Sequence, residues 1–179
     1  MDNSKDNICG ILPVKKPEGW TSFDVIAKLR GVLRIKRLGH SGTLDPMATG
    51  VLPVFVGRAT KACDIIPDRR KVYTAGFQLG VSTDTLDSTG KTLKTSDKAV
   101  ARADLECAKS SFVGDIMQVP PMYSAIKVNG KKLYELAREG KTVERKARTV
   151  HFYEIDIKEI NLPYVRFSVT CSKGTYIRT

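Results

Sequence analysis

Alternating apolar and polar positions predict several β-strands along the chain. In residues 71–79, for example, Tyr73, Ala75, Phe77 and Leu79 fall on one face of an extended segment. Strand-like segments are predicted at residues 8–14, 51–56, 71–79, 123–128, 150–157 and 165–171.

Other stretches repeat their apolar residues every three or four positions, as helices do. The first begins at Thr21 and Ser22 and carries Val25, Ile26 and Leu29 on one face. Helices are predicted at residues 22–33, 59–66, 101–112 and 132–139, the second ended by Pro67, with polar loops at 39–50 and 81–92. Strands and helices without a strict βαβ rhythm predict an α+β fold, with flanking helices on a mixed, mostly antiparallel central sheet.

Composition narrows the class of protein. The 179 residues are 41% hydrophobic and 27% charged, as in an ordinary globular chain, and a length near 180 is most simply one domain. The four cysteines contain no Cys-x-x-Cys pair and there are two histidines, so we expect neither a metal site nor a disulfide framework. The longest apolar run has six residues and the N-terminus is polar, so we expect no membrane span, no secretory signal and a cytoplasmic location.

The formal net charge of +11 is unevenly distributed. Residues 25–44 contain five basic residues and no acidic ones, and residues 127–148 contain eight basic residues against three acidic ones. Such clusters are solvated helix faces in many proteins. Two of them around a nearly neutral segment favour a nucleic-acid partner, because Lys and Arg attract phosphate without reading sequence.

The loop at residues 39–50 is the first place where chemistry is plausible. Three glycines let its backbone approach a ligand, Pro46 stiffens the chain, and Asp45 is one carboxylate among basic neighbours. Asp before Pro is also common in turns, so both readings stay open at this point.

Several segments resemble, in the same order, motifs of the TruB family of pseudouridine synthases. Residues 39–52 read GHSGTLDPMATGVL and resemble the family's G-H-x-G-x-L-D-P-x-A-x-G-x-L motif. The other matching segments are KPEGWTS at 16–22, KVY at 71–73, GVSTDTLD at 80–87, QVPPMYSAIK at 118–127, LY at 133–134, AREG at 137–140 and CSKGTYIR at 171–178.

The resemblance implies an enzyme that converts uridine to pseudouridine at position 55 in the T-loop of tRNA, with no cofactor. It implies that Asp45 is the catalytic nucleophile, acting on C6 of uracil or on C1′ of the ribose. Arg178 is the basic partner that keeps this carboxylate ionised, and Tyr73 packs on the target base and helps to move the C5 proton. Judged from pattern alone, Arg178 would be a surface residue and Tyr73 a core residue.

The resemblance also implies contacts with RNA. His40 and Tyr176 correspond to positions that contact a uridine extruded from the folded T-loop, although a histidine that caps the loop is an alternative for His40. Lys16 is implied as part of the substrate site, more by shaping it than by reacting.

The basic segment at about residues 121–150 resembles a thumb-like insertion that grips the T-arm stem-loop. Lys127, Lys132 and Arg138 are its expected RNA contacts.

Under this interpretation residues 1–179 form one incomplete catalytic domain, truncated at its C-terminus, and the family's C-terminal PUA-type domain is absent from the chain. We expect a monomer whose partner is tRNA. Two alternatives remain, a guide-RNA-dependent rRNA pseudouridine synthase relative and a non-catalytic module that binds or folds tRNA. The second would not need Asp45.

Overall fold

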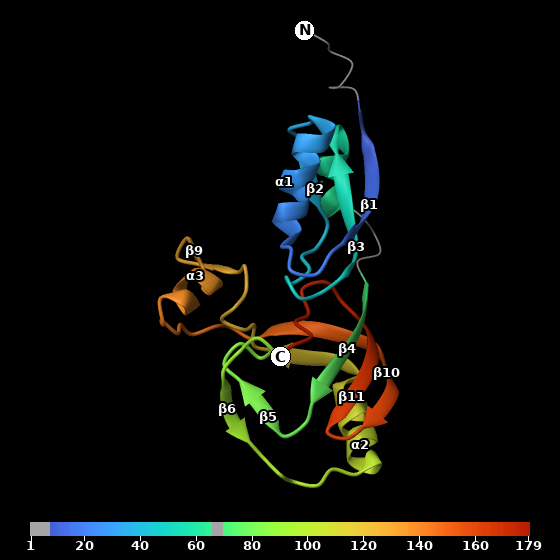
Figure 1. Cartoon of the computed structure of the whole chain (residues 1–179), viewed down its shortest axis with the longest axis vertical. Helices are drawn as coiled ribbons and strands as arrows, with labels where there is room; N and C mark the ends of the chain where they lie inside the picture. The colour runs from blue at the N-terminus through green and yellow to red at the C-terminus, as the bar shows by residue number, and fades with distance from the viewer. Residues whose placement is uncertain (1–7, 66–69) are drawn as a thin grey trace. The chain divides into compact units, whose positions relative to one another are not determined.

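The computed structural model describes residues 8–65 and 70–179 (Figure 1). Contacts within the chain divide it into two compact units, Met1–Arg69 and Arg70–Thr179, and each unit is described by itself.

The first unit contains a three-stranded antiparallel sheet with the order β1-β3-β2. Its elements in chain order are β1 (Gly10–Lys16), α1 (Ser22–Leu33), β2 (Leu38–His40), β3 (Gly50–Val56) and the 3₁₀ helix η2 (Gly57–Asp64). A short helix is predicted at 59–66; the structure has a 3₁₀ helix there that starts two residues earlier, and the predicted end at Ile66 and Pro67 lies outside the described residues.

Helix α1 begins where the sequence predicts. Thr21 is its N-cap, and the Thr21 side chain accepts a hydrogen bond from the Asp24 backbone N–H while the Asp24 carboxylate accepts one from the Thr21 backbone N–H. Val25 and Ile26 turn inward and pack in one buried cluster with Leu52 and Val54 of β3. This packing fixes α1 against the sheet of the first unit.

The second unit is built on a four-stranded antiparallel sheet with the order β4-β11-β10-β7. Its strands are β4 (Lys71–Gln78), β7 (Gly114–Gln118), β10 (Arg148–Asn161) and β11 (Tyr164–Cys171). Val165, Val169 and Cys171 are buried, as the alternation in β11 predicts. Helix α2 (Arg102–Phe112) lies beside the sheet (Figure 1). The aromatic rings of Phe112 and Phe152 meet edge to face.

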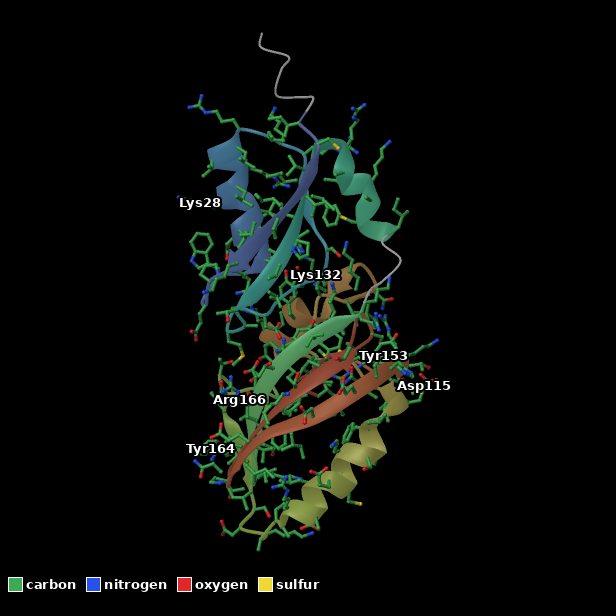
Figure 2. The ribbon with its side chains drawn as sticks, turned by 90° about the vertical axis from the view of Figure 1, so that its right-hand side faces the viewer. Lys28, Asp115, Lys132, Tyr153, Tyr164 and Arg166 are labelled. Atoms are coloured by element: carbon green, nitrogen blue, oxygen red, sulfur yellow. The ribbon has the colours of Figure 1, made fainter. Side chains whose placement is uncertain are left out.

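The side chains on the other face of this sheet project outward (Figure 2). Tyr164 and Arg166 of β11 and Tyr153 of β10 are exposed there. Asp115 of β7 pairs with His151 of β10, with 2.7 Å between the carboxylate Oδ1 and the ring Nδ1.

One prediction about the second unit is corrected, and one of its strands is missed by the sequence. The predicted polar loop at 81–92 belongs to a small hairpin. It contains β5 (Val81–Thr83) and the turn that joins β5 to β6 (Thr92–Thr95). Strand β7 is not predicted at all.

The basic segment at about 121–150 contains a smaller hairpin and a short helix. Its elements are β8 (Lys127–Val128), β9 (Lys131–Lys132) and α3 (Leu133–Arg138). The strand predicted at 123–128 is wrong except for its last two residues, because residues 122–125 form bends. The predicted helix at 132–139 is confirmed to within one residue at each end.

Candidate functional site

Asp45 lies half-buried in the loop between β2 and β3, and Ser22 of α1 holds the preceding residue in place. The Leu44 backbone N–H donates to the Ser22 hydroxyl at 3.0 Å, and that hydroxyl donates back to the Leu44 carbonyl oxygen at 3.3 Å. Ser22 is 2% exposed. The backbone beside the carboxylate is thus bound to the first turn of a capped helix.

Lys16 lies beneath the same loop. Its side chain is 0% exposed, and its ammonium donates to the carbonyl oxygens of Trp20 at 2.6 Å, Pro17 at 2.9 Å and Pro46 at 3.1 Å. Burial lowers the pKa of Lys16, against smaller opposing effects of nearby carboxylates, Asp45 foremost. A direct contact of this ammonium with RNA does not fit its burial, whereas shaping the loop does.

His40 is the last residue of β2, and its ring folds back onto the loop. The ring Nδ1 donates to the Gly42 carbonyl oxygen; a carbonyl can only accept, so Nδ1 carries the proton in this contact. Gly42 has a backbone φ of 87°, in the left-handed region that glycine enters without strain. The loop-capping alternative therefore describes the observed contact.

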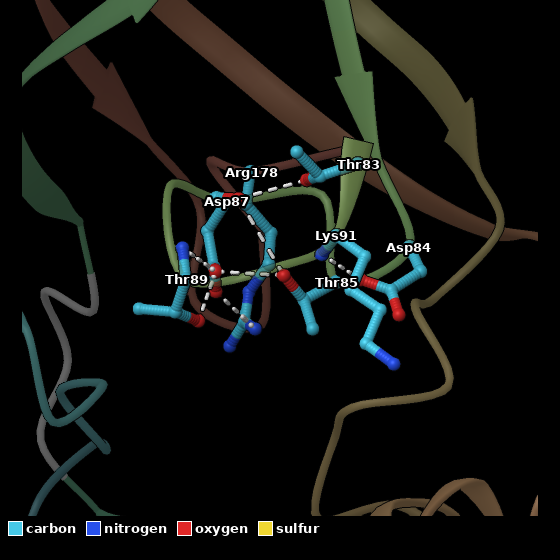
Figure 3. Close-up of polar contacts among 7 residues, drawn as sticks. All are labelled: Thr83, Asp84, Thr85, Asp87, Thr89, Lys91 and Arg178. Carbon is cyan, nitrogen blue, oxygen red and sulfur yellow. Dashed lines mark hydrogen bonds and ion pairs between the residues drawn. The ribbon is translucent and has the colours of Figure 1, made fainter. Parts of the chain in front are cut away.

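Arg178 forms an ion pair with Asp87 in the second unit (Figure 3). The guanidinium Nη1 is 3.1 Å from the carboxylate Oδ2, and the two side chains are only 14% and 13% exposed. Asp87 is not among the predicted site residues. The only sequence signal for it is its place in the GVSTDTLD segment.

The Asp87 carboxylate is also held by two threonines of its own turn (Figure 3). Its Oδ1 accepts from the Thr89 hydroxyl at 2.6 Å, the Thr85 hydroxyl at 2.8 Å and the Thr89 backbone N–H at 3.0 Å. Burial by itself raises the pKa of Asp87, but these hydrogen bonds and Arg178 together lower it below the usual value. Asp87 is therefore ionised at neutral pH and presents a fixed negative charge to Arg178.

Asp84 has a different role in the same turn. Its Oδ1 accepts from the Lys91 backbone N–H at 2.8 Å, which closes the hairpin of β5 and β6 (Figure 3). A Cβ at Gly90 would lie 2.3 Å from the Thr85 hydroxyl and 2.5 Å from Asp84 Oδ1, so the turn requires glycine there. This is the turn-stabilising role that Asx side chains commonly play.

Tyr73 and Tyr176 both lie in the second unit. Tyr73 of β4 is half-buried and packs against the core cluster of Val150, Phe152, Val169 and Cys171, as does Ile177 beside Tyr176. Tyr176 is half-buried at the rim of a largely apolar hollow of about 350 Å³, which α2 and the sheet form together with residues 176–179. Tyr73 thus packs on the same core cluster as Ile177, which lies between Tyr176 and Arg178 in the chain.

Two of the predicted thumb residues lie beside one aromatic ring. Lys132 Nζ and Arg138 Cζ each lie 5.3 Å from the centre of the Tyr134 ring, and Lys132 also donates to the Tyr134 hydroxyl at 3.2 Å. Lys127 is exposed on β8, where it pairs in register with Lys132. The three cations lie on one small hairpin and helix, an arrangement suited to phosphates.

Asp45 belongs to the first unit, and Tyr73 and Arg178 belong to the second. The pairing of Asp45 with Arg178 therefore stays a prediction. Within the ranges that the structure describes, no three His, Cys, Asp or Glu side chains are grouped so as to hold a metal ion, and no helix has the length and apolar character to cross a membrane.

Chains with a similar fold are found in several solved complexes. A chain of a Cbf5–Nop10–Gar1 complex is 28% identical with a TM-score of 0.69, and the match covers 98% of this chain and 43% of that one. A chain of an H/ACA RNP bound to a substrate RNA containing 2′-deoxyuridine is 26% identical with a TM-score of 0.65, covering 94% and 39%. The α+β fold is that of the pseudouridine synthases.

The family follows from the sequence comparison. The profile described as TruB family pseudouridylate synthase (N terminal domain) matches residues 30–177, and the chain belongs to this family. It is 57% identical over 170 residues to tRNA pseudouridine synthase B of Clostridium novyi and 55% identical to that of Clostridium kluyveri. In both cases the match covers 95% of this chain and 59% of the relative, so the chain spans about three fifths of these relatives.

Proposed function

We propose that this chain carries the catalytic machinery of an enzyme that isomerises uridine to pseudouridine at position 55 in the T-loop of tRNA. Its relatives are named tRNA pseudouridine synthase B. The observation that carries the proposal is the loop of Asp45, whose backbone neighbours are fixed by the buried Lys16 and Ser22. A carboxylate that must attack one atom of one base needs such a rigid support.

In the proposed reaction Asp45 is the nucleophile. It attacks C6 of the uracil or C1′ of the ribose, the glycosidic bond breaks, the base turns, and a new bond forms from C5 to C1′. Arg178 keeps Asp45 ionised and oriented, and Asp87 holds the guanidinium of Arg178. Tyr73 packs on the base and helps to move the C5 proton. No step requires a cofactor.

The proposed substrate is the T-arm stem-loop of tRNA. The target uridine must leave the folded loop before Asp45 can reach it, and unstacking it costs roughly a few kcal/mol. His40 and Tyr176 would contact the opened loop, while Lys127, Lys132 and Arg138 of the thumb, about residues 121–150, would bind phosphates. We propose that residues 1–179 act as one catalytic domain in a monomeric, cytoplasmic protein.

Replacement of the nucleophile tests this function. We expect Asp45→Asn to abolish tritium release from tRNA labelled with 5-³H-uridine, because an amide is too weak a nucleophile, while binding to tRNA on filters changes less than threefold. Asp97→Asn, at an exposed aspartate, is the matched control and should release tritium at the parental rate. Equal tritium release by the parent protein and Asp45→Asn would contradict the assignment of Asp45 as the nucleophile. If neither protein releases tritium, the result would favour the non-catalytic module.

A second candidate function is guide-RNA-dependent modification of rRNA, which is favoured by the similarity to chains of an H/ACA RNP and of an archaeal box H/ACA sRNP complex. The two candidates differ in the RNA that they require. Conversion of a bare T-arm stem-loop without guide RNA supports the tRNA enzyme. Conversion that depends on an added guide RNA would support the second candidate.

A further inference from the structure

The side chain of Gln118 makes two hydrogen bonds to the backbone of one residue far along the chain. Gln118 Nε2 donates to the Tyr176 carbonyl oxygen and the Tyr176 backbone N–H donates to Gln118 Oε1, each at 2.9 Å. Gln118 is 8% exposed. A backbone N–H can only donate and a carbonyl can only accept, so these contacts fix the orientation of the amide.

The sequence explains why a side chain makes this link. Gln118 is the last residue of β7, and Pro120 and Pro121 follow it. Proline has no backbone N–H, so Pro120 and Pro121 cannot donate main-chain hydrogen bonds to a neighbouring segment. The primary amide of Gln118 has one donor and one acceptor side by side, and it replaces the missing strand partner.

Gln118 is the first of three successive anchors on the segment that carries Arg178. Tyr176 is held through its backbone by Gln118, Ile177 packs against the core cluster, and Arg178 is paired with Asp87. Arg178 lies two residues beyond the tethered peptide groups, within about 7 Å along the chain. A shift of the Tyr176 backbone would therefore move the guanidinium away from its partners.

We propose that Gln118 is a positioning residue for the reaction, which sets the backbone of Tyr176 and through it the guanidinium of Arg178. This inference rests on the proposed function, because it assigns the tether to the same site. The QVPPMYSAIK segment, whose first residue is Gln118, thereby acquires a role in that site.

Two replacements of Gln118 test the inference. Both are introduced into the full-length protein that the gene encodes. Gln118→Met keeps the length of the side chain and removes both hydrogen bonds. We expect its single-turnover rate of pseudouridine formation at saturating T-arm RNA to fall at least tenfold. The dissociation constant for RNA should change less than threefold, because Lys127, Lys132 and Arg138 are untouched.

Gln118→Glu adds a readout that loss of packing cannot imitate. The protonated acid has the same donor and acceptor as the amide, whereas the carboxylate has no donor for the Tyr176 carbonyl oxygen. Burial favours the protonated form. We expect its rate, relative to the parent, to rise at least threefold from pH 8 to pH 6, and this variant also serves if Gln118→Met does not fold.

Gln78→Met is the matched control, at an exposed glutamine at the end of β4, and should keep the parental rate. Hydrogen exchange of the Tyr176 amide gives a readout independent of activity, and should be at least tenfold faster in Gln118→Met than in the parent protein.

Three outcomes would overturn the inference. They are a folded Gln118→Met with the parental rate, a Gln118→Glu whose rate relative to the parent does not change with pH, and an unchanged exchange rate at Tyr176. Inactivity of the parent protein would instead contradict the proposed function, while the exchange measurement still tests the tether.

Discussion

At the scale of single residues, the carboxylate of Asp87 is held by several polar groups of the second unit. Two threonine hydroxyls, one backbone N–H and the Arg178 guanidinium converge on its carboxylate. A mostly buried charge is stable only when its hydrogen-bonding positions are filled in this way. Thr85 and Thr89 thus allow Asp87 to stay ionised beneath Arg178, and Arg178 has a fixed partner inside its own unit.

This arrangement predicts how stability depends on pH. The pKa of Asp87 is lowered in the folded protein relative to the unfolded value of about 3.9. Its ionised form therefore stabilises the fold above about pH 4, and this contribution is lost as pH falls through the lower, folded pKa. We expect Asp87→Asn to unfold more easily in urea at pH 7, by on the order of 2 kcal/mol, with the difference shrinking towards pH 2.

The control for this measurement is Asp97→Asn, whose carboxylate is exposed. Its unfolding curve should follow that of the parent protein at every pH. A constant difference between Asp87→Asn and the parent from pH 7 to pH 2 would show that ionisation of Asp87 does not stabilise the fold.

Arg178 also shows what a sequence cannot reveal about a site. The resemblance identifies the residue, but its partner Asp87 is 91 positions away in the chain, and no local pattern joins the two. Lys16 is a similar case. Its positive charge suggests a surface residue, and of the three carbonyl oxygens that allow its burial, the one from Pro46 is 30 positions away in the chain.

At the scale of elements, local signals decide which predictions are confirmed. Helix α1 has a Thr-x-x-Asp capping box and an apolar face, and β11 alternates strictly, so both are visible in the sequence. Strand β7 has five residues with glycine and aspartate at its start, and its pairing with the distant β10 makes it a strand. Hairpin β5–β6 is likewise formed by pairing rather than by an apolar pattern.

The cap of α1 yields a prediction about stability. Thr21→Ala removes the hydroxyl that accepts from the Asp24 backbone N–H, and we expect it to lower the free energy of unfolding by about 1 kcal/mol. Urea unfolding monitored by circular dichroism measures this change. Thr142→Ala, at an exposed position outside helices and strands, should have little effect. Equal stabilities of the two variants would mean that the cap contributes nothing.

At the scale of the whole molecule, the net charge of +11 predicts how the affinity for tRNA depends on salt concentration. If the basic clusters bind phosphates, affinity for tRNA must fall steeply as the salt concentration rises. The thumb supplies cations held near one ring, whereas Lys158 of the sheet is paired with Asp156 at 2.6 Å. The position of a basic residue therefore decides whether its charge contributes to phosphate binding.

The thumb can be tested by the salt dependence of binding. We expect replacement of both Lys132 and Arg138 by alanine to reduce the slope of log K against log salt by about 2, roughly one unit for each phosphate that is no longer neutralised. Lys158→Ala in β10 with Arg166→Ala in β11 removes the same charge from the sheet and serves as control. Equal slopes for the two double variants would show that net charge alone governs binding.

The burial of Lys16 has a consequence for how the loop of Asp45 moves. Three carbonyl oxygens from two chain segments meet one ammonium that has no access to water. Opening the loop alone would take the Pro46 acceptor away from this buried ammonium and leave it only Pro17 and Trp20, so the loop and the β1–β3 sheet should open as one cooperative unit. The Gly19 amide, which donates to Pro46 at 2.8 Å, should therefore exchange its hydrogen only when the whole unit unfolds, as slowly as the core amides of β3.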